Sequence, residues 1–301
     1  MSNGGSLQPR PTKNEKREAA REKARQLREE QARKDKRRRL IWQLSAIVGV
    51  VAIAAGLFFG YQAYQKSQLS ASAGPANMLS DGLVVTAKGP VLTAAIPAGG
   101  SPVATKQDTS SNAVNIVIYY DYLCPYCGEF EAANNAYIQQ LVQNGATLEM
   151  HPIAILTDKS QGTRYSERAA NAFACVAAND PNVAVAFSSL LFANQPEEGT
   201  SGLSDSQLKN FVTQAGSTNA QVIGTCIDNQ TYKNWVQSAT NRALNNTSLR
   251  DSQGNFGTPR VLINGNLFSG SPSDANEFKA FVVQATSETS STASPTPTPT
   301  Q

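Results

Sequence analysis

The pattern of apolar residues in the middle of the chain predicts a strand, a helix and a second strand in succession. Residues 112–120 form an apolar run rich in β-branched and aromatic side chains, which is typical of a buried strand. From 125 to 145 the apolar residues recur at helical spacing, and this pattern ends at Gly145. Residues 146–156 form another strand-like run. Together the three segments predict a βαβ unit.

Helical patterns dominate the next part of the chain. Between about residues 160 and 250, five segments repeat apolar residues at helical intervals. Residues 260–268 then predict two short strands around Asn264-Gly265, a dipeptide typical of hairpins. A last helix is predicted over residues 273–287. The fold class predicted from this order is α/β, with a sheet interrupted by an inserted helical subdomain.

A separate apolar run near the N-terminus predicts one transmembrane helix over residues 41–62. No charged residue occurs between Arg39 and Lys66. About twenty mostly apolar residues, at a rise of about 1.5 Å each, match the hydrocarbon thickness of a bilayer. Trp42 near one end and Tyr61 near the other suit the two membrane interfaces.

Two other interpretations of this run remain open. A cleaved signal peptide would use the small residues at 71–74, but these lie far downstream and the leader before the run is long. A buried core helix is the other alternative, and it fits less well because the run has no polar face.

The charge distribution sets the expected topology. The 301-residue chain has a net charge of +3, yet residues 1–39 hold 14 Lys/Arg against 6 Asp/Glu, so this tail carries +8 and the remainder −5. Basic residues before a membrane helix favour the cytoplasmic side. A nucleic-acid-binding tail is the alternative, but acids interleave with the bases and aromatic residues are lacking. We therefore predict a single-pass cell-membrane protein, with a cytoplasmic N-terminus, an extracytoplasmic folded domain and no nucleic-acid partner.

Composition divides the chain into five regions. The C-terminal residues are rich in Ser, Thr and Pro and are expected to be disordered, because they lack apolar residues to bury. The predicted regions are a basic cytoplasmic tail (1–40), the transmembrane helix (41–62), a stalk with lead-in strands (63–112), the folded domain (113–286) and the tail (287–301).

Cys124 and Cys127 flank Pro125-Tyr126 at the predicted junction of strand and helix. Unpaired N–H groups and the helix dipole at a helix N-terminus stabilise a thiolate, so the pKa of Cys124 should fall. Cys127, one turn later, is placed to resolve a mixed disulfide. A static disulfide is a weaker reading, because such short loops are easily reduced. Zinc is weaker still, since a closed site needs four ligands and no second close Cys/His pair exists.

The segments IYYDYLCPYCGEFE, HPIAIL, YSERAANAFACV and FGTPRVLINGNLFSG occur in this order. With them, residues from about 113 to 286 resemble a membrane-anchored member of the DsbA family, an actinobacterial type of thiol–disulfide oxidoreductase with a thioredoxin fold. The resemblance implies that Cys124 is the exposed attacking cysteine and Cys127 the buried resolving one. It also implies that Pro259, preceded by Thr258, is the cis-proline that helps to bind the substrate backbone.

The chain departs from the family pattern at two places. The dipeptide between the cysteines is Pro-Tyr rather than the Pro-His of the strongly oxidising type, so a less oxidising pair is expected. Many thioredoxin-fold enzymes have a buried acid six residues before the first cysteine, where this chain has Ile118. Asp121, Glu129 and Glu131 are not obvious replacements. We expect Asp121 to cap the turn or to be solvated, with a proton-relay role as the alternative.

Cys175 and Cys226 both lie in the predicted helical insertion. Four cysteines allow three pairings, and assigning the first two to the active site leaves these two to form a structural disulfide. A second redox centre is the alternative, but neither has a neighbouring cysteine. His151, the sole histidine, is expected to be packed or hydrogen-bonded; a pH switch or base is the other reading.

These observations predict an extracytoplasmic enzyme that introduces disulfide bonds into secreted proteins. Its expected partners are reduced secreted proteins, the lipid bilayer and a quinone-linked membrane protein that reoxidises it, and no metal or other cofactor is expected. Two alternatives remain: a membrane-tethered thiol reductase or disulfide isomerase, for example in cytochrome maturation, and a non-catalytic peptide-binding module.

Overall fold

The computed structural model describes residues 21–23, 25, 31, 34, 53–61, 73–110 and 113–292, with side chains as far as residue 287. The chain forms two compact units, Met1–Gln65 and Lys66–Gln301. In the first unit, residues 53–61 are helical, whereas the rest of the predicted transmembrane segment lies outside the described residues. Within the part of the chain that is described, no helix has both the length and the apolar character needed to cross a membrane.

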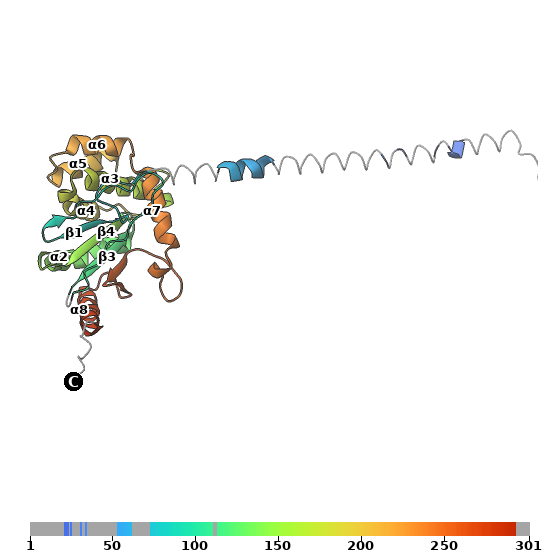
Figure 1. Cartoon of the computed structure of the whole chain (residues 1–301). Helices are drawn as coiled ribbons and strands as arrows, with labels where there is room; N and C mark the ends of the chain where they lie inside the picture. The colour runs from blue at the N-terminus through green and yellow to red at the C-terminus, as the bar shows by residue number, and fades with distance from the viewer. Residues whose placement is uncertain are drawn as a thin grey trace, which may run out of the picture. The chain divides into compact units, whose positions relative to one another are not determined.

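The second unit is built on a sheet of six strands in the order β2-β1-β4-β3-β5-β6 (Figure 1). Strands β3 and β4 are parallel, as expected for a βαβ unit, and every other neighbouring pair is antiparallel. The strands are β1 (Leu83–Thr86), β2 (Gly89–Pro90), β3 (Asn115–Tyr120), β4 (Thr147–Pro152), β5 (Arg260–Ile263) and β6 (Asn266–Leu267).

The helices follow the order that the sequence predicts. Helix α2 connects β3 to β4, α3 to α7 lie between β4 and β5, and α8 follows β6. Their bounds are α2 (Pro125–Gln143), α3 (Tyr165–Asn179), α4 (Ala184–Ala193), α5 (Asp205–Gln214), α6 (Ala220–Asp228), α7 (Lys233–Asn245) and α8 (Ala275–Thr292), with short 3₁₀ turns at Thr157–Lys159, Pro181–Val183 and Thr247–Leu249.

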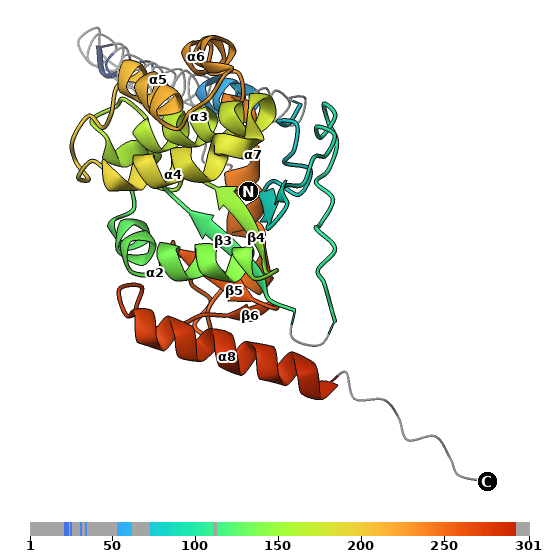
Figure 2. The ribbon, with the colours of Figure 1, turned by 90° about the vertical axis from the view of Figure 1, so that its left-hand side faces the viewer.

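The helices are arranged around the sheet in distinct groups. Helices α3, α4, α5 and α6 gather at one end of this unit, and α8 lies at the other (Figures 1 and 2). Helix α2 contacts both α4 and α8. The helical segment therefore packs directly against the helix that begins with the cysteine pair.

The two faces of the sheet bury different clusters, because successive side chains of a strand point to opposite faces. Ile118 and Tyr120 lie on the face covered by α2, where they line a small cavity together with α2 side chains. Tyr119 lies on the other face. It packs against a cluster that includes Ala243, in the last turn of α7, and Leu249, in the 3₁₀ turn that follows. Both faces of β3 are thus covered by helices.

Part of the segment predicted as a stalk belongs to the fold. Strand β1 pairs with β4 inside the sheet, and Met78, Leu83 and Ile96 are buried. Asp81 accepts two hydrogen bonds from the Arg242 guanidinium, at 2.6 and 2.7 Å. Residues 73–110 are therefore a structural part of the second unit.

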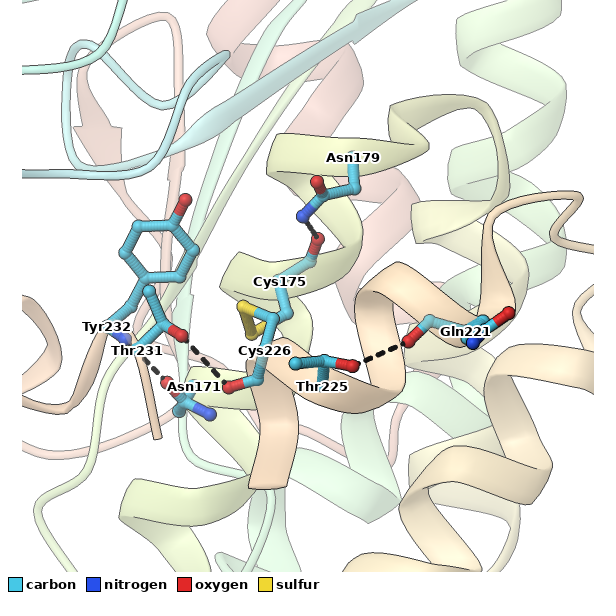
Figure 3. Close-up of a disulfide and its surroundings, with 8 residues drawn as sticks. All are labelled: Asn171, Cys175, Asn179, Gln221, Thr225, Cys226, Thr231 and Tyr232. Atoms are coloured by element: carbon cyan, nitrogen blue, oxygen red, sulfur yellow. Dashed lines mark hydrogen bonds between the residues drawn. A yellow bond between two sulfur atoms is a disulfide. The ribbon is translucent and has the colours of Figure 1, made fainter. Parts of the chain in front are cut away.

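A disulfide links Cys175 on α3 to Cys226 on α6 (Figure 3). Hydrogen bonds surround it: Asn179 donates to the Cys175 carbonyl at 2.8 Å, and Thr231 donates to the Cys226 carbonyl at 3.2 Å. Since α3 packs against α4, α6 and α7, the bond ties together helices that are distant in sequence.

The helix at the C-terminus differs from the prediction in length. Helix α8 continues to Thr292, past the domain boundary expected at residue 286, so residues 287–292 are helical rather than disordered. Phe278 anchors this helix through edge-on contacts with Phe130 of α2 and Phe268. The remaining C-terminal residues lie outside the described part of the chain.

Candidate active site

The cysteine pair lies at the start of α2, just after the loop that follows β3. Cys124 is the N-cap of α2 and has an extended backbone, whereas Cys127 is inside the first helical turn. Pro125 occupies the first helical position, where the N–H group that proline lacks would have no intrahelical partner. Both thiols are free. The local sequence thus places one thiol at the helix N-terminus and the other one turn further along.

The accessibility of Cys124 differs from what the family resemblance implies. Cys124 is only 5% exposed and Cys127 is 2% exposed, so both cysteines are buried. The neighbouring Tyr126 is 60% exposed. The side chains of Leu123 and Tyr122, which precede Cys124, are fully buried and hold the loop deep in the domain. The exposed feature at the centre of the site is therefore Tyr126, between the two thiols.

The two thiols have different acidities. A hydrogen bond from the Cys127 thiol, helped by the Cys127 backbone N–H, lowers the pKa of Cys124 to about 7 even though burial acts in the opposite direction. Burial raises the pKa of Cys127 well above its ordinary value, and its interaction with Cys124 adds to that rise. Near neutral pH, Cys124 is therefore partly ionised, whereas Cys127 remains a protonated thiol.

The loop before β5 closes the site from the other side. The Thr258–Pro259 peptide bond is cis, and the Cys124 thiol donates to the Thr258 carbonyl at 3.2 Å. Pro259 lines the same small cavity as Cys127. The structure thus brings together four residues that the sequence singled out for the site. They come from two segments more than a hundred residues apart: Cys124 and Cys127, and Thr258 and Pro259.

Asp121 is buried rather than solvated. Its carboxylate accepts hydrogen bonds from the backbone N–H groups of Leu123 at 2.9 Å and Leu156 at 2.8 Å, and the residue is fully buried. Asp121 therefore caps the turn before Cys124, which confirms the expectation of a capping role. Burial raises its pKa to about 6, although these hydrogen bonds oppose the shift.

Glu131 is a potential acid–base group that the sequence did not reveal. It lies one helical turn after Cys127, and the two residues line one cavity of about 20 Å³ between the sheet, α2 and α4. This space is close to that needed for one water molecule. Burial raises the pKa of Glu131 to about 7, while a hydrogen bond from Ser189 at 3.1 Å opposes the shift. A signal for this residue exists in its spacing, since Cys127 and Glu131 are four apart on one helix.

The network around Glu131 spans two helices. Asn135 on α2 donates to the Ser189 hydroxyl at 3.0 Å, and Ser189 on α4 donates to the Glu131 carboxyl. Most other side chains around the cavity are apolar, among them Ile138, Val185 and Phe192. The Glu131 carboxyl group is therefore held in place at the cavity that Cys127 also lines.

His151 has the structural role that was expected. Its ring stacks on Tyr119 with ring centres 4.2 Å apart, and its Nε2 lies 3.1 Å from the Glu149 carboxylate. It lies on the sheet face opposite to the cavity beside Cys127. Among the described residues, no group of three or more His, Cys, Asp or Glu side chains is arranged to hold a metal ion.

This arrangement is suited to thiol–disulfide exchange. An acidic thiol attacks or leaves readily, and a neighbouring thiol with a high pKa resolves the mixed disulfide once it loses its proton. Glu131 titrates near neutral pH, so it is able to give or take that proton. Cys175 and Cys226 do not belong to this site, because they lie on α3 and α6.

Comparison with known proteins agrees with the fold. Residues 109–284 match the model of the family described as Thioredoxin. Three similar structures each have a TM-score of 0.50. A DsbG disulfide oxidoreductase from Mycobacterium tuberculosis is 24% identical and covers 71% of this chain and 94% of its own. BdbD from Bacillus subtilis is 17% identical, with 72% and 98% covered. DsbA from Chlamydia trachomatis is 18% identical, with 62% and 96% covered. A sequence search of curated proteins gives no match.

Proposed function

The chain belongs to the thioredoxin family, and from this we propose that it is a DsbA-type thiol–disulfide oxidoreductase that introduces disulfide bonds into secreted proteins. The observation that carries the proposal is the divided acidity of the pair: the pKa of Cys124 is lowered to about 7, whereas that of Cys127 is raised well above its ordinary value. Such a pair has one sulfur suited to attack by substrate and one suited to resolution.

The reaction begins with the pair in its disulfide form. A substrate thiolate attacks the Cys124 sulfur, the bond between Cys124 and Cys127 breaks, and the electron pair goes to the Cys127 sulfur. Because burial makes a Cys127 thiolate unfavourable, this sulfur takes a proton, and we assign its delivery to the Glu131 carboxyl, which lines the same cavity and titrates near neutral pH. A second substrate thiolate then attacks the substrate sulfur of the mixed disulfide and releases Cys124 as a thiolate.

The products balance in electrons. The substrate gains one disulfide bond and loses two electrons, which remain on the two enzyme sulfurs. The enzyme must then be reoxidised, and we assign this step to a quinone-linked membrane protein. The exposed Tyr126 and the Thr258-Pro259 loop flank the thiols and would contact the substrate chain. No further cofactor is needed for the exchange itself.

We also propose that residues 41–62 anchor the enzyme in the cell membrane, with the N-terminus in the cytoplasm and the catalytic domain outside. The charge pattern supports this topology, since residues 1–39 carry a net +8 directly before an uncharged apolar run. An oxidising exterior is also the compartment in which structural disulfides persist, and this chain has one between Cys175 and Cys226.

A reductase or isomerase is the second candidate. The pKa of Cys124, about 7, favours it, because strongly oxidising members of this fold have a far more acidic cysteine, with a pKa of about 3.5. A less stable thiolate makes the disulfide form a weaker oxidant. The two candidates use the same residues and differ in the direction of electron flow.

The reduction potential of the Cys124/Cys127 pair separates them. The full-length chain, purified in detergent, would be equilibrated with glutathione mixtures, and the oxidised fraction read by thiol alkylation. A potential less negative than about −230 mV supports the oxidase, whereas a value at or below about −250 mV, close to that of thioredoxin, contradicts it and supports the reductase. A chain with no measurable exchange, in either direction, would leave only the peptide-binding module.

A further inference from the structure

One face of α4 and the residues just after it lie along the segment that leads to Cys124. The Ser188 hydroxyl is 3.1 Å from the Tyr122 hydroxyl, and the Phe192 ring lies 4.9 Å from the Tyr122 ring, centre to centre. The Gln195 side-chain amide donates to the Tyr122 carbonyl at 3.1 Å and to the Cys124 carbonyl at 2.9 Å. Ser188 and Phe192 lie one turn apart on α4, and Gln195 lies in the loop just after this helix.

Gly128 makes the approach of Gln195 possible. A β-carbon on Gly128 would overlap the Gln195 side-chain oxygen. Gly128 lies inside α2 with an ordinary helical backbone, where glycine is less favourable than alanine. Its backbone therefore does not require glycine, and the space taken by Gln195 supplies the reason for a residue without a side chain here.

The Cys124 carbonyl is a meeting point of three donors. It accepts the backbone N–H groups of Cys127 at 3.0 Å and Gly128 at 3.3 Å, in addition to the Gln195 amide. The first two are bonds of α2 itself, whereas the third comes from the loop after α4. The Gln195 amide thus ties the backbone of the N-cap residue Cys124 to the loop after α4.

We infer that Gln195 is a positioning residue that fixes Cys124 at the N-terminus of α2, so that the helical segment helps to set the reactivity of the thiol. Gly128 has the complementary role of admitting the Gln195 side chain. The inference rests on the proposed function only in taking Cys124 as the reactive thiol. It adds a device outside the Cys-Pro-Tyr-Cys motif that stabilises the thiolate.

A double-mutant cycle tests the inference. Gln195→Ala, Gly128→Ala and the double variant would be made in the full-length chain, and the pKa of Cys124 read from the pH dependence of its alkylation rate. Each single substitution should raise that pKa by about one unit, which means about a tenfold loss of thiolate below the pKa. Since alanine at 195 leaves room for a β-carbon at 128, adding Gly128→Ala to Gln195→Ala should change nothing further.

Helix α6 supplies matched controls. Gln221 is exposed, and a β-carbon on Gly224 would meet only the flexible side chain of Lys209, at 3.2 Å. Gln221→Ala and Gly224→Ala should leave the pKa of Cys124 unchanged. Thermal unfolding of all variants would show that each one folds, and Gln195→Met, which keeps the length of the side chain but not its donors, should reproduce the shift of Gln195→Ala.

Two results would overturn the inference. One is a Cys124 pKa that stays the same in Gln195→Ala and Gln195→Met. The other is a Gly128→Ala substitution that raises the Cys124 pKa as much when residue 195 is alanine as when it is glutamine. These outcomes are separate from a failure of the proposed function. The oxidase is judged from the potential of the unsubstituted chain, whereas the role of Gln195 is judged from differences between variants, which remain measurable whether the protein oxidises or reduces its substrates.

Discussion

Replacing Glu131 by glutamine should have opposite effects on stability and on catalysis. The folded protein raises the pKa of Glu131 from 4.5 to about 7, chiefly by burial. A shift of about 2.5 units at about 1.4 kcal/mol each sets an upper limit of about 3.5 kcal/mol, and we expect about 2 kcal/mol because solvent partly reaches the side chain. This is the free energy by which an ionised Glu131 should weaken the fold.

The sign follows from proton binding. The folded state holds the Glu131 proton more tightly than the unfolded chain does. The contribution of this proton to the stability of the fold is therefore complete below about pH 4.5 and is lost as the pH rises through about 7. Glutamine does not titrate. The free energy of unfolding of Glu131→Gln, relative to the unsubstituted chain, should therefore rise by about 2 kcal/mol between those two pH values.

Urea unfolding of the full-length chain in detergent, measured below pH 4.5 and above pH 7, gives this difference directly. Glu129→Gln is the matched control, because Glu129 lies on the same helix but is exposed. The same pH dependence in Glu131→Gln and in the unsubstituted chain would refute the reasoning, since it would mean that Glu131 has an ordinary pKa in the folded protein.

The same substitution should slow the exchange reaction. Positioned acids and bases contribute a factor of about 10² to 10⁴ to a rate, so the oxidation of a reduced peptide near neutral pH should slow by about tenfold or more. The reduction potential should change little, because glutamine alters the path of the proton rather than the energies of the two sulfurs. An unchanged rate would show that Cys127 takes its proton directly from solvent.

Three further predictions concern the cysteines and the buried aspartate. Cys124→Ser should abolish exchange, whereas Cys127→Ser should still attack a disulfide-bonded substrate through Cys124, release one substrate thiol and accumulate the mixed disulfide, visible on non-reducing gels. Replacing Cys175 and Cys226 together by alanine should lower the free energy of unfolding by about 4 kcal/mol, because the bond closes a loop of 51 residues; thermal unfolding with and without reductant checks this. Asp121→Asn should lower the pKa of Cys124, since the buried carboxylate opposes the thiolate, and should destabilise the fold by about 1–3 kcal/mol by leaving one backbone N–H without its acceptor.

The order of strands and helices was accessible from the sequence because apolar periodicity reports which faces are buried. The run at 112–120 coincides with β3, which is covered on both faces, and the helical spacing from 125 onward coincides with α2. The run at 146–156 ends earlier than predicted, since β4 stops at Pro152. The length of α8 also differed, because its last residues are polar and carry no apolar pattern.

The acid–base groups of the site were not accessible in the same way. Glu131 and Asp121 look like ordinary charged residues in the sequence, and their raised pKa values come chiefly from burial against segments that lie far along the chain, such as α4 beside Glu131. Gln195 escaped notice for the same reason, as its partners are backbone carbonyls more than seventy residues away. Local pattern predicts the cysteines and the turn that presents them, whereas their chemistry depends on contacts made by the helical segment.

The acidity of Cys124 bears directly on the direction of electron flow. In DsbA a cysteine pKa of about 3.5 accompanies a potential of about −120 mV, and each pKa unit corresponds to about 30 mV, so a pKa of about 7 corresponds to roughly −220 mV. Structural disulfides of secreted proteins have potentials below about −300 mV. Transfer of a disulfide to such a substrate therefore remains favourable by about 80 mV, or roughly 4 kcal/mol. A moderately acidic Cys124 is thus compatible with an oxidase, provided that a membrane partner keeps the pair oxidised.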